Sequence, residues 1–292
     1  MKIFTKTLLL TAITFFTANS LQAQTIVVPD TLNGWTQTWV ANLNGSQATY
    51  SNWSEGGVNT VSGTASTVYT KMYRKEQHTF GFRTNLRYGQ SKVAGDTRKS
   101  DDLISIRLRT TYDLQEDSKV AAYGAIQFRT QFADGYDYEA KMNPAGGDSL
   151  ISGFFSPAYL TEGAGLEYNA NPSLQIEAGL ALKQTFISDG DLSPNYGLSQ
   201  GDTFRSEGGL TTGISFQTTV AENIQYSSNL ETFTSFTDPV SETDVFWANE
   251  LVGQINSIIS ASFQFEMRYD DDFSSEVQIK QVLSAGISVN LY

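Results

Sequence analysis

The sequence predicts an all-β fold, a transmembrane antiparallel up-and-down β-barrel of about twelve strands. Three observations lead to this prediction. They are an export signal at the N-terminus, a series of long stretches that alternate apolar and polar residues, and a regular alternation of short and long connections. The composition agrees, because 18 Phe, 14 Tyr and 24 Gly against 6 Pro favour extended strands joined by tight turns.

The N-terminal segment predicts export. Lys2 and Lys6 precede an apolar stretch from about Thr7 to Ala18, and small and polar residues follow up to Ala23. This stretch is too short to cross a ~30 Å hydrocarbon core as a helix. We therefore expect residues 1–23 to be a signal peptide and residues 24–292 to form the barrel domain. The chain has no Cys, so neither a lipidated cysteine nor a disulfide is expected.

The exported part favours two broad classes of protein. It contains no apolar run of ~18 residues, so no helical span is expected. Its 31 Asp and Glu against 19 Lys and Arg argue against nucleic acid as a partner. A secreted soluble β protein and an outer-membrane barrel remain.

Strand length separates these two classes. Strands of soluble domains are most often about 5–6 residues long, whereas a tilted membrane strand needs about 9–11 residues inside the bilayer. The expected strands are longer than both, and they lie at 36–48, 58–73, 77–92, 101–114, 119–133, 155–169, 173–187, 203–220, 223–237, 244–255, 257–269 and 276–291.

The connections give the orientation. Tight links (RKEQ, QEDS, NANP, VAEN and NS) alternate with longer ones such as VAGDTRKS, SDGDLSPNYGLSQG and DDDFSS. Outer-membrane barrels have short periplasmic turns and longer extracellular loops. An even strand number then places both termini in the periplasm, with the barrel in the outer membrane of a Gram-negative bacterium.

Alternation within the strands assigns their faces. In a soluble sandwich the apolar face would point into a core, but the length and loop patterns favour an apolar face toward lipid and a polar face toward a lumen. In 257–269 the apolar set is Ile259, Ala261, Phe263, Phe265, Met267 and Tyr269, and the polar set is Ser260, Ser262, Gln264, Glu266 and Arg268.

The C-terminal strand completes the pattern. Its alternation continues to Leu291, and a closed barrel would pair this strand with the first one. The ending resembles the C-terminal signature of outer-membrane proteins, a final alternating strand that closes on an aromatic residue. Tyr292 is out of phase with the apolar set, so either Leu291 takes the terminal role or the last residues twist.

The segment Ser46 to Gly63 carries a second resemblance. Asn52, Trp53 and Ser54, followed by Gly56 and Gly57 and then an alternating strand, resemble an uncharacterised family of Bacteroidota outer-membrane proteins, classed as a domain of unknown function. The resemblance implies a location and a fold but no activity. From the residues alone, the two glycines predict a turn and Trp53 a place in a rim girdle or at the mouth.

Charged residues occupy the predicted lumen face near mid-height. Three neighbouring strands contribute a basic wall of Arg83, Arg87, Arg107, Arg109 and Arg129, and three others an acidic wall of Glu231, Glu250 and Glu266. The walls would face each other across a barrel roughly 24 Å wide. Two interpretations remain open: a solute-selective constriction, or a structural network of ion pairs that fills the lumen. Further inward charges provide partners for such pairing (Glu167, Glu177, Lys183, Arg205, Glu207, Arg268 and Lys280).

These observations lead to a functional hypothesis, a monomeric passive channel for small polar solutes. The alternative is a closed structural or surface-interaction barrel that acts through its extracellular loops, while the polar lumen argues against a transporter of apolar solutes. Expected partners are outer-membrane lipid and lipopolysaccharide, and the barrel assembly machinery during insertion.

We expect no cofactor, no bound metal and no enzymatic activity. The acidic run Asp270 to Asp272 lacks the ligand spacing of an EF-hand loop. An outer-membrane acyl hydrolase would need a serine activated by histidine, and the single histidine, His78, is predicted to face lipid at the periplasmic end of its strand.

Overall fold

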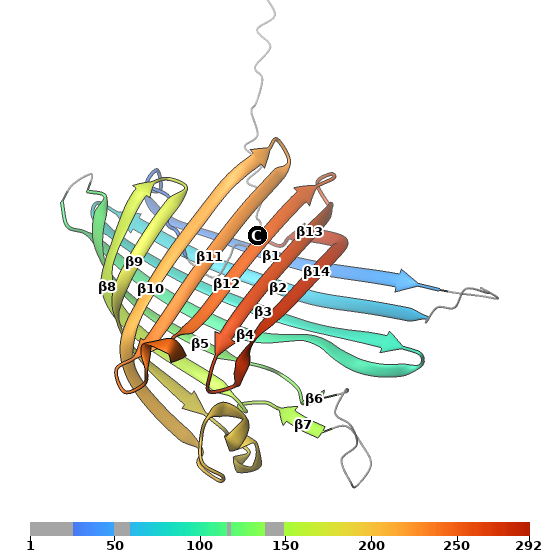
Figure 1. Ribbon diagram of the computed structural model, residues 1–292. Helices are drawn as coiled ribbons and strands as arrows, with labels where there is room; N and C mark the ends of the chain where they lie inside the picture. Colours follow the sequence, from blue (N-terminus) through green and yellow to red (C-terminus); the bar gives the residue numbers. More distant parts are fainter. Residues whose placement is uncertain (1–25, 50–58, 116–117, 138–148) are drawn as a thin grey trace, which may run out of the picture.

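The computed structural model describes residues 26–49, 59–115, 118–137 and 149–292. Within these ranges, twelve antiparallel strands close into one barrel in the order β1-β14-β13-β12-β11-β10-β9-β8-β5-β4-β3-β2 (Figure 1). The predicted fold class is confirmed. The predicted signal peptide lies outside the described residues.

Each of the twelve predicted stretches corresponds to one barrel strand. The strands are β1 (Gly34–Ala48), β2 (Thr60–Lys75), β3 (His78–Val93), β4 (Asp96–Asp113), β5 (Val120–Thr130), β8 (Ala158–Asn171), β9 (Leu174–Phe186), β10 (Phe204–Ala221), β11 (Ile224–Ser235), β12 (Asp244–Gln254), β13 (Ile259–Asp270) and β14 (Ser274–Asn290).

Closure occurs between the first and last strands. β1 pairs with β14 from Val40↔Asn290 to Gly45↔Ala285. Beyond this ladder, the Leu291 amide donates to the Trp39 carbonyl at 2.7 Å. The final strand is therefore held by hydrogen bonds to a neighbour on each side, as a closed barrel requires.

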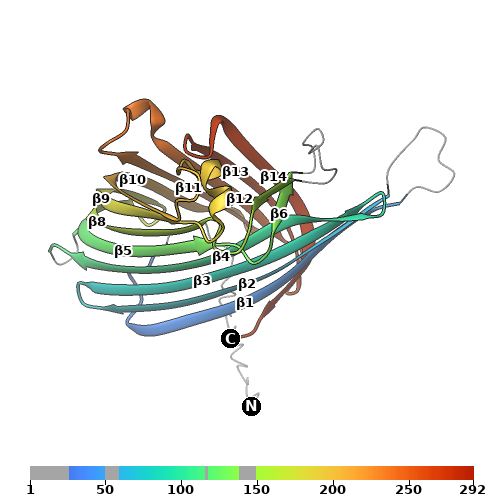
Figure 2. The ribbon, with the colours of Figure 1, turned by 90° about the horizontal axis from the view of Figure 1, so that it is seen from below.

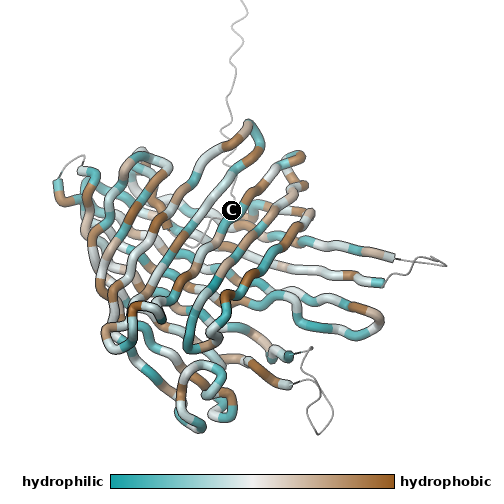
Figure 3. Tube along the Cα trace, viewed as in Figure 1, coloured by the Kyte–Doolittle hydropathy of each residue, from teal (hydrophilic) through white to brown (hydrophobic). Residues whose placement is uncertain are grey.

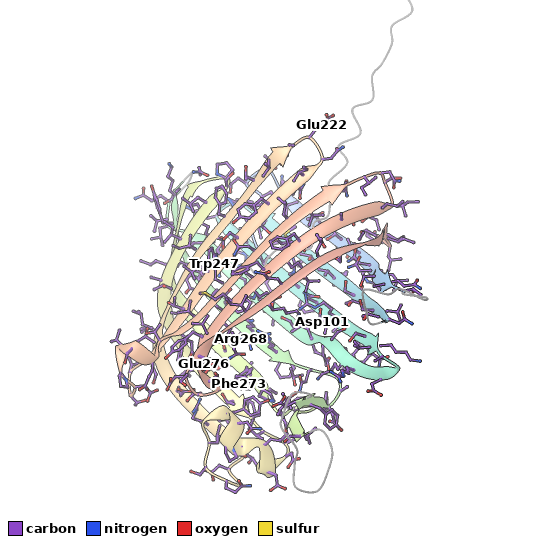
Figure 4. The ribbon with its side chains drawn as sticks, turned by 45° about the vertical axis from the view of Figure 1, so that its right-hand side comes forward. Asp101, Glu222, Trp247, Arg268, Phe273 and Glu276 are labelled. Carbon is purple, nitrogen blue, oxygen red and sulfur yellow. The ribbon has the colours of Figure 1, made fainter. Side chains whose placement is uncertain are left out.

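The two rims of the barrel differ. The short-turn rim carries the links β2–β3, β4–β5, β8–β9, β10–β11 and β12–β13, together with the start of β1 and the end of β14. The loop rim carries the other links. Glu222, in the β10–β11 turn, and Phe273, between β13 and β14, lie at opposite ends of the molecule (Figure 4).

Two links on the loop rim are shorter than predicted. The segment 93–100 is not a loop, because β3 and β4 extend to a turn at Ala94 and Gly95, with φ of 53° and 105°. Positive φ at both positions matches the twist of a two-residue hairpin, which allows strand pairing to continue to the tip. The link between β13 and β14 is likewise a tight turn, from Asp271 to Phe273.

The longer links form structure that the alternation does not predict. The link β5–β8 contains a hairpin of β6 (Gly135–Asp137) and β7 (Ser149–Ser152), β9–β10 contains the 3-10 helix η1 (Gly190–Tyr196), and β11–β12 contains η2 (Val240–Glu242). Ile187, Leu192, Tyr196 and Leu198 form an apolar cluster. The Tyr196 hydroxyl donates to the Ile151 carbonyl at 2.9 Å, which fastens η1 to β7 at the loop rim (Figure 1).

The barrel is apolar outside and charged inside, the reverse of a soluble protein. Leu180, Ile279 and Leu283 are 61%, 62% and 78% exposed, whereas Arg83 and Arg109 are only 6% exposed. Apolar and polar residues alternate along the strands (Figure 3). This distribution is typical of a membrane-spanning barrel. None of the described helices has the length and apolarity needed to cross a bilayer.

Candidate functional site

The structure places all the predicted wall residues on the inner face of the barrel. β3, β4 and β5 carry the five arginines, and β11, β12 and β13 carry the three glutamates. The two groups of strands lie on opposite sides of the lumen (Figure 2). The inner residues are Arg83, Arg87, Arg107, Arg109, Arg129, Glu231, Glu250 and Glu266.

One ion pair joins the two walls directly. Arg107 on β4 donates from Nη1 and Nη2 to Glu231 Oε1 on β11, at 3.0 and 3.1 Å. Nη2 also donates to Gln127 Oε1 at 2.5 Å, and Asn229 Nδ2 donates to Glu231 Oε1 at 2.9 Å. We call this contact the cross-lumen pair. It spans the barrel at mid-height, so the walls are not simply two opposed surfaces with a gap between them.

Arg109 has its partners on the same side of the barrel, on β8 and β9, which lie two and three strands away from β4. Its Nη2 donates to Glu167 Oε2 on β8 and to Glu177 Oε2 on β9, both at 2.6 Å. The guanidinium also lies 4.4 Å from the centroid of the Tyr123 ring. Gln175 Nε2 donates to Glu167 Oε2 at 2.7 Å. This compact network pairs one member of the basic wall with carboxylates that do not belong to the acidic wall.

Arg87 forms another bridge between the walls, and this bridge includes β14. Its Nε lies 2.7 Å from Asp101 Oδ2 on β4, and its Nη2 lies 3.7 Å from Glu266 Oε1 on β13. Lys280 on β14 donates to Asp101 Oδ1 at 3.0 Å. Asp101 therefore connects two cations that come from opposite sides of the closure between β1 and β14 (Figure 4 labels Asp101).

Glu250 and Arg83 are both buried at the inner face. Glu250 Oε1 accepts a hydrogen bond from Gln264 Nε2 at 2.9 Å, and the two residues lie on the paired strands β12 and β13. Their exposed fractions are 8% for Glu250 and 6% for Arg83. Each of the two opposite walls therefore carries a buried ionisable side chain, which is costly unless it has polar partners in the lumen.

Four acidic residues near the loop rim form ion pairs with two cations, Lys183 and Arg205. Lys183 Nζ lies 2.5 Å from Asp244 Oδ2 and 3.8 Å from Asp270 Oδ2. Arg205 pairs with Asp272 and, at 3.0 Å, with Glu207. Asp270 and Asp272 of the acidic run are thus engaged in ion pairs. Over the described part of the chain, no group of three or more His, Cys, Asp or Glu is arranged to hold a metal ion.

Two cavities lie on either side of the cross-lumen pair. The larger, with a volume of 1380 Å³, occupies the short-turn half and includes Asn229 in its lining. The smaller, with a volume of 140 Å³, lies toward the loop rim and includes Glu231. Because Asn229 and Glu231 are two residues apart on β11, the pair lies at the boundary between the cavities.

The segment before β1 enters the larger cavity. Ile26 is 3% exposed, and a methyl group added at Gly81 on the inner face of β3 would collide with its side chain. Asp30 Oδ1 accepts from Arg74 Nη2 at 2.8 Å. This placement could not be predicted from the residues, because 24–35 show no alternation of apolar and polar side chains.

Two predicted features remain, the motif from Asn52 to Gly57 and the single histidine, His78. Asn52, Trp53, Ser54, Gly56 and Gly57 lie outside the described residues. His78 lies on the exposed outer surface at the short-turn end of β3, with Nε2 3.1 Å from Thr110 Oγ1. The position of His78 is the predicted one.

Comparison with known proteins gives one family match. Residues 46–136 match the model of a family described as a protein of unknown function (DUF3078). The match covers less than half of the chain, and the matching family is of unknown function, as expected; the motif Asn52 to Gly57 and the Bacteroidota origin stay predictions. No curated protein matches the chain.

Solved outer-membrane proteins match the chain at low similarity. The translocator domain of the autotransporter NalP from Neisseria meningitidis is 12% identical, with a TM-score of 0.41, over 88% of this chain and 87% of that one. An outer membrane channel from Pseudomonas putida F1 is 9% identical, with a TM-score of 0.41, over 91% and 99%. The KdgM porin, in complex with disordered oligogalacturonate, is 10% identical, with a TM-score of 0.35, over 86% and 97%. Likeness at this level carries no conclusion about activity.

Proposed function

We propose that this protein is an outer-membrane channel for small polar solutes, with its bore set by the cross-lumen pair of Arg107 and Glu231. The observation that carries the proposal is the position of that pair, at the boundary between a cavity of 1380 Å³ and one of 140 Å³ within a polar, charge-lined lumen. A solute moving between the cavities would pass beside these two side chains, which makes them the narrow point.

The lining favours polar solutes over apolar ones. The inner face carries buried arginines and glutamates, whereas the large apolar side chains face outward. An apolar solute gains little free energy on moving from water into such a polar lumen. A polar solute loses hydrogen bonds to water on entry but can form hydrogen bonds with the wall in their place. We assign no catalytic step to the chain, since its single histidine lies on the outer surface.

The proposal includes a location and partners. The outward apolar band would contact outer-membrane lipid, and the loop rim would face lipopolysaccharide, with both termini in the periplasm. Insertion of such a barrel would depend on the barrel assembly machinery of a Gram-negative cell.

Single-channel recording in planar bilayers tests the channel. We expect the wild type to show small conductance steps in KCl, and Arg107→Ala combined with Glu231→Ala to raise the step size at least twofold, because two side chains that span the lumen are removed. The matched control is Lys75→Ala combined with Glu222→Ala, which removes the same charges from exposed positions on the short-turn rim. If neither the wild type nor the Arg107 and Glu231 variant conducts, the channel is excluded.

A closed structural or surface-interaction barrel is the second candidate. It is favoured by the number of ion pairs that link distant strands, including Arg107–Glu231, Arg87–Glu266 and Lys280–Asp101. Absence of conductance in both proteins, with correctly folded barrels, is the result that this candidate predicts.

A further inference from the structure

The smaller cavity contains two arginines that the ion-pair network does not use. Arg129 on β5 and Arg268 on β13 both line this space, together with Tyr159 on β8 and Phe246 on β12. It lies on the loop side of the cross-lumen pair, and Figure 4 labels Arg268 near that end of β13.

The carboxylates of this cavity already have cationic partners. Glu231 is bound by Arg107, and Lys183 lies between Asp244 and Asp270. Among the described residues, by contrast, neither Arg129 nor Arg268 forms an ion pair or a side-chain hydrogen bond. The Tyr159 hydroxyl also has no hydrogen-bond partner within the described ranges, and it lines the same space.

An aromatic ring holds the two guanidinium groups in place. Arg129 Cζ lies 5.8 Å from the centroid of Phe246 and Arg268 Cζ lies 5.6 Å from it. Contact with a ring stabilises a cation through the ring face but leaves its N–H groups unbonded. Each guanidinium has five N–H donors in a fixed planar fork, a shape that matches two oxygens of a carboxylate or phosphate.

We propose that Arg129 and Arg268, with Tyr159, form a binding site for an oxyanion, a single carboxylate or phosphate group carried by a small solute. The cavity volume of 140 Å³ accommodates a group a few times larger than a water molecule, whose share of liquid volume is about 30 Å³. This inference rests on the proposed channel function for its physiological meaning. It adds the class of solute that would bind beside the narrow point.

Recognition at this site depends on contacts and not on the overall potential of the cavity. The lining carries Arg129, Lys183 and Arg268 against Glu231, Asp244 and Asp270, so the formal charges balance. Charge-assisted bidentate hydrogen bonds are short and directional, and they select an oxyanion over chloride of the same charge. Neutral solutes lack the charge that two guanidinium groups prefer.

Equilibrium binding to the purified full-length barrel in detergent tests the site. Inorganic phosphate and acetate are titrated separately, with NaCl at matched ionic strength as the reference. We expect saturable binding of at least one of the two anions, and a loss of affinity of at least tenfold in Arg129→Gln combined with Arg268→Gln. The matched control, Lys75→Gln combined with Lys119→Gln, removes the same charge from exposed positions near the short-turn rim and should stay within twofold of the wild type.

A conservative variant separates binding from folding. Arg129→Lys combined with Arg268→Lys keeps both charges but loses the planar fork, so we expect it to fold as the wild type and to bind more weakly. The inference is overturned if the wild type binds neither anion saturably, or if the glutamine variant binds as tightly as the wild type.

Failure of the site and failure of the channel give different results. Anion binding without conductance would support the binding site and refute the channel. Conductance without anion binding would support the channel and refute the binding site.

Discussion

The cross-lumen pair predicts a measurable coupling between Arg107 and Glu231. Their side chains are 10% and 26% exposed, so each is largely removed from water. Arg107→Ala would leave the Glu231 carboxylate with Asn229 as its remaining described hydrogen-bond donor. Removing one partner of a buried ion pair costs about 3–5 kcal/mol. Because a quarter of the Glu231 side chain is exposed and solvent screening applies, we expect a loss of about 2–3 kcal/mol in the free energy of unfolding.

Urea unfolding of the barrel in detergent measures this coupling through a double-mutant cycle. Arg107→Ala, Glu231→Ala and the combined variant are compared with the wild type. The combined loss should be smaller than the sum of the single losses by about 2 kcal/mol, because the second substitution removes a charge that the first left unpaired. If the two losses add within about 0.5 kcal/mol, the side chains are not in contact across the lumen and the assignment of the narrow point fails.

Three further predictions concern other parts of the molecule. Gly81→Leu should expel Ile26 from the lumen, since even a methyl group at this position collides with it, and limited proteolysis with mass spectrometry should then detect cleavage before β1 at least tenfold faster than in the wild type. Leu180→Arg places a charge on the outer face in the middle of β9, where it should cost about 2–4 kcal/mol in the free energy of unfolding measured in lipid vesicles; no loss would contradict a lipid-facing position. Tyr196→Phe removes the hydrogen bond to the Ile151 carbonyl, so hydrogen exchange should speed up in the loop that contains η1 by the equivalent of about 1 kcal/mol while the barrel amides stay protected, and uniform acceleration throughout would refute a local role.

Strand number and the inward placement of the charges could be predicted because both follow from a period of two residues. Once one residue of a strand is known to face lipid, every second residue shares that face, and closure fixes which strands are opposite each other. The placement of Arg107 and Glu231 across from each other was therefore accessible from parity and strand count alone.

The partners of individual charges could not be predicted in the same way. Parity places Arg109, Glu167 and Glu177 on the inner face, but it does not tell whether a flexible side chain reaches across the lumen or along the wall. The structure shows that Arg109 reaches along the wall, since its Nη2 lies 2.6 Å from the carboxylates of Glu167 on β8 and Glu177 on β9.

Segments without a repeating pattern were the least predictable. Residues 187–203 contain no alternation, yet Leu192 and Tyr196 are buried in a cluster that depends on contacts between two separate links. The hairpin between β3 and β4 differs from the predicted loop for another reason. Its charged residues suggest a loop, whereas Ala94 and Gly95 provide the backbone conformation of a tight turn and the strands continue to it.

The ladder that closes the barrel has a mechanical consequence. β1 forms six residue pairs with β14, from Val40↔Asn290 to Gly45↔Ala285, whereas it forms fifteen with β2. The join between β1 and β14 is therefore the weakest line in the circumference. Under heat or lateral tension from the bilayer, β1 and β14 should separate first. The barrel would then open into a sheet with two free edges, whose unpaired backbone N–H and C=O groups would face acyl chains.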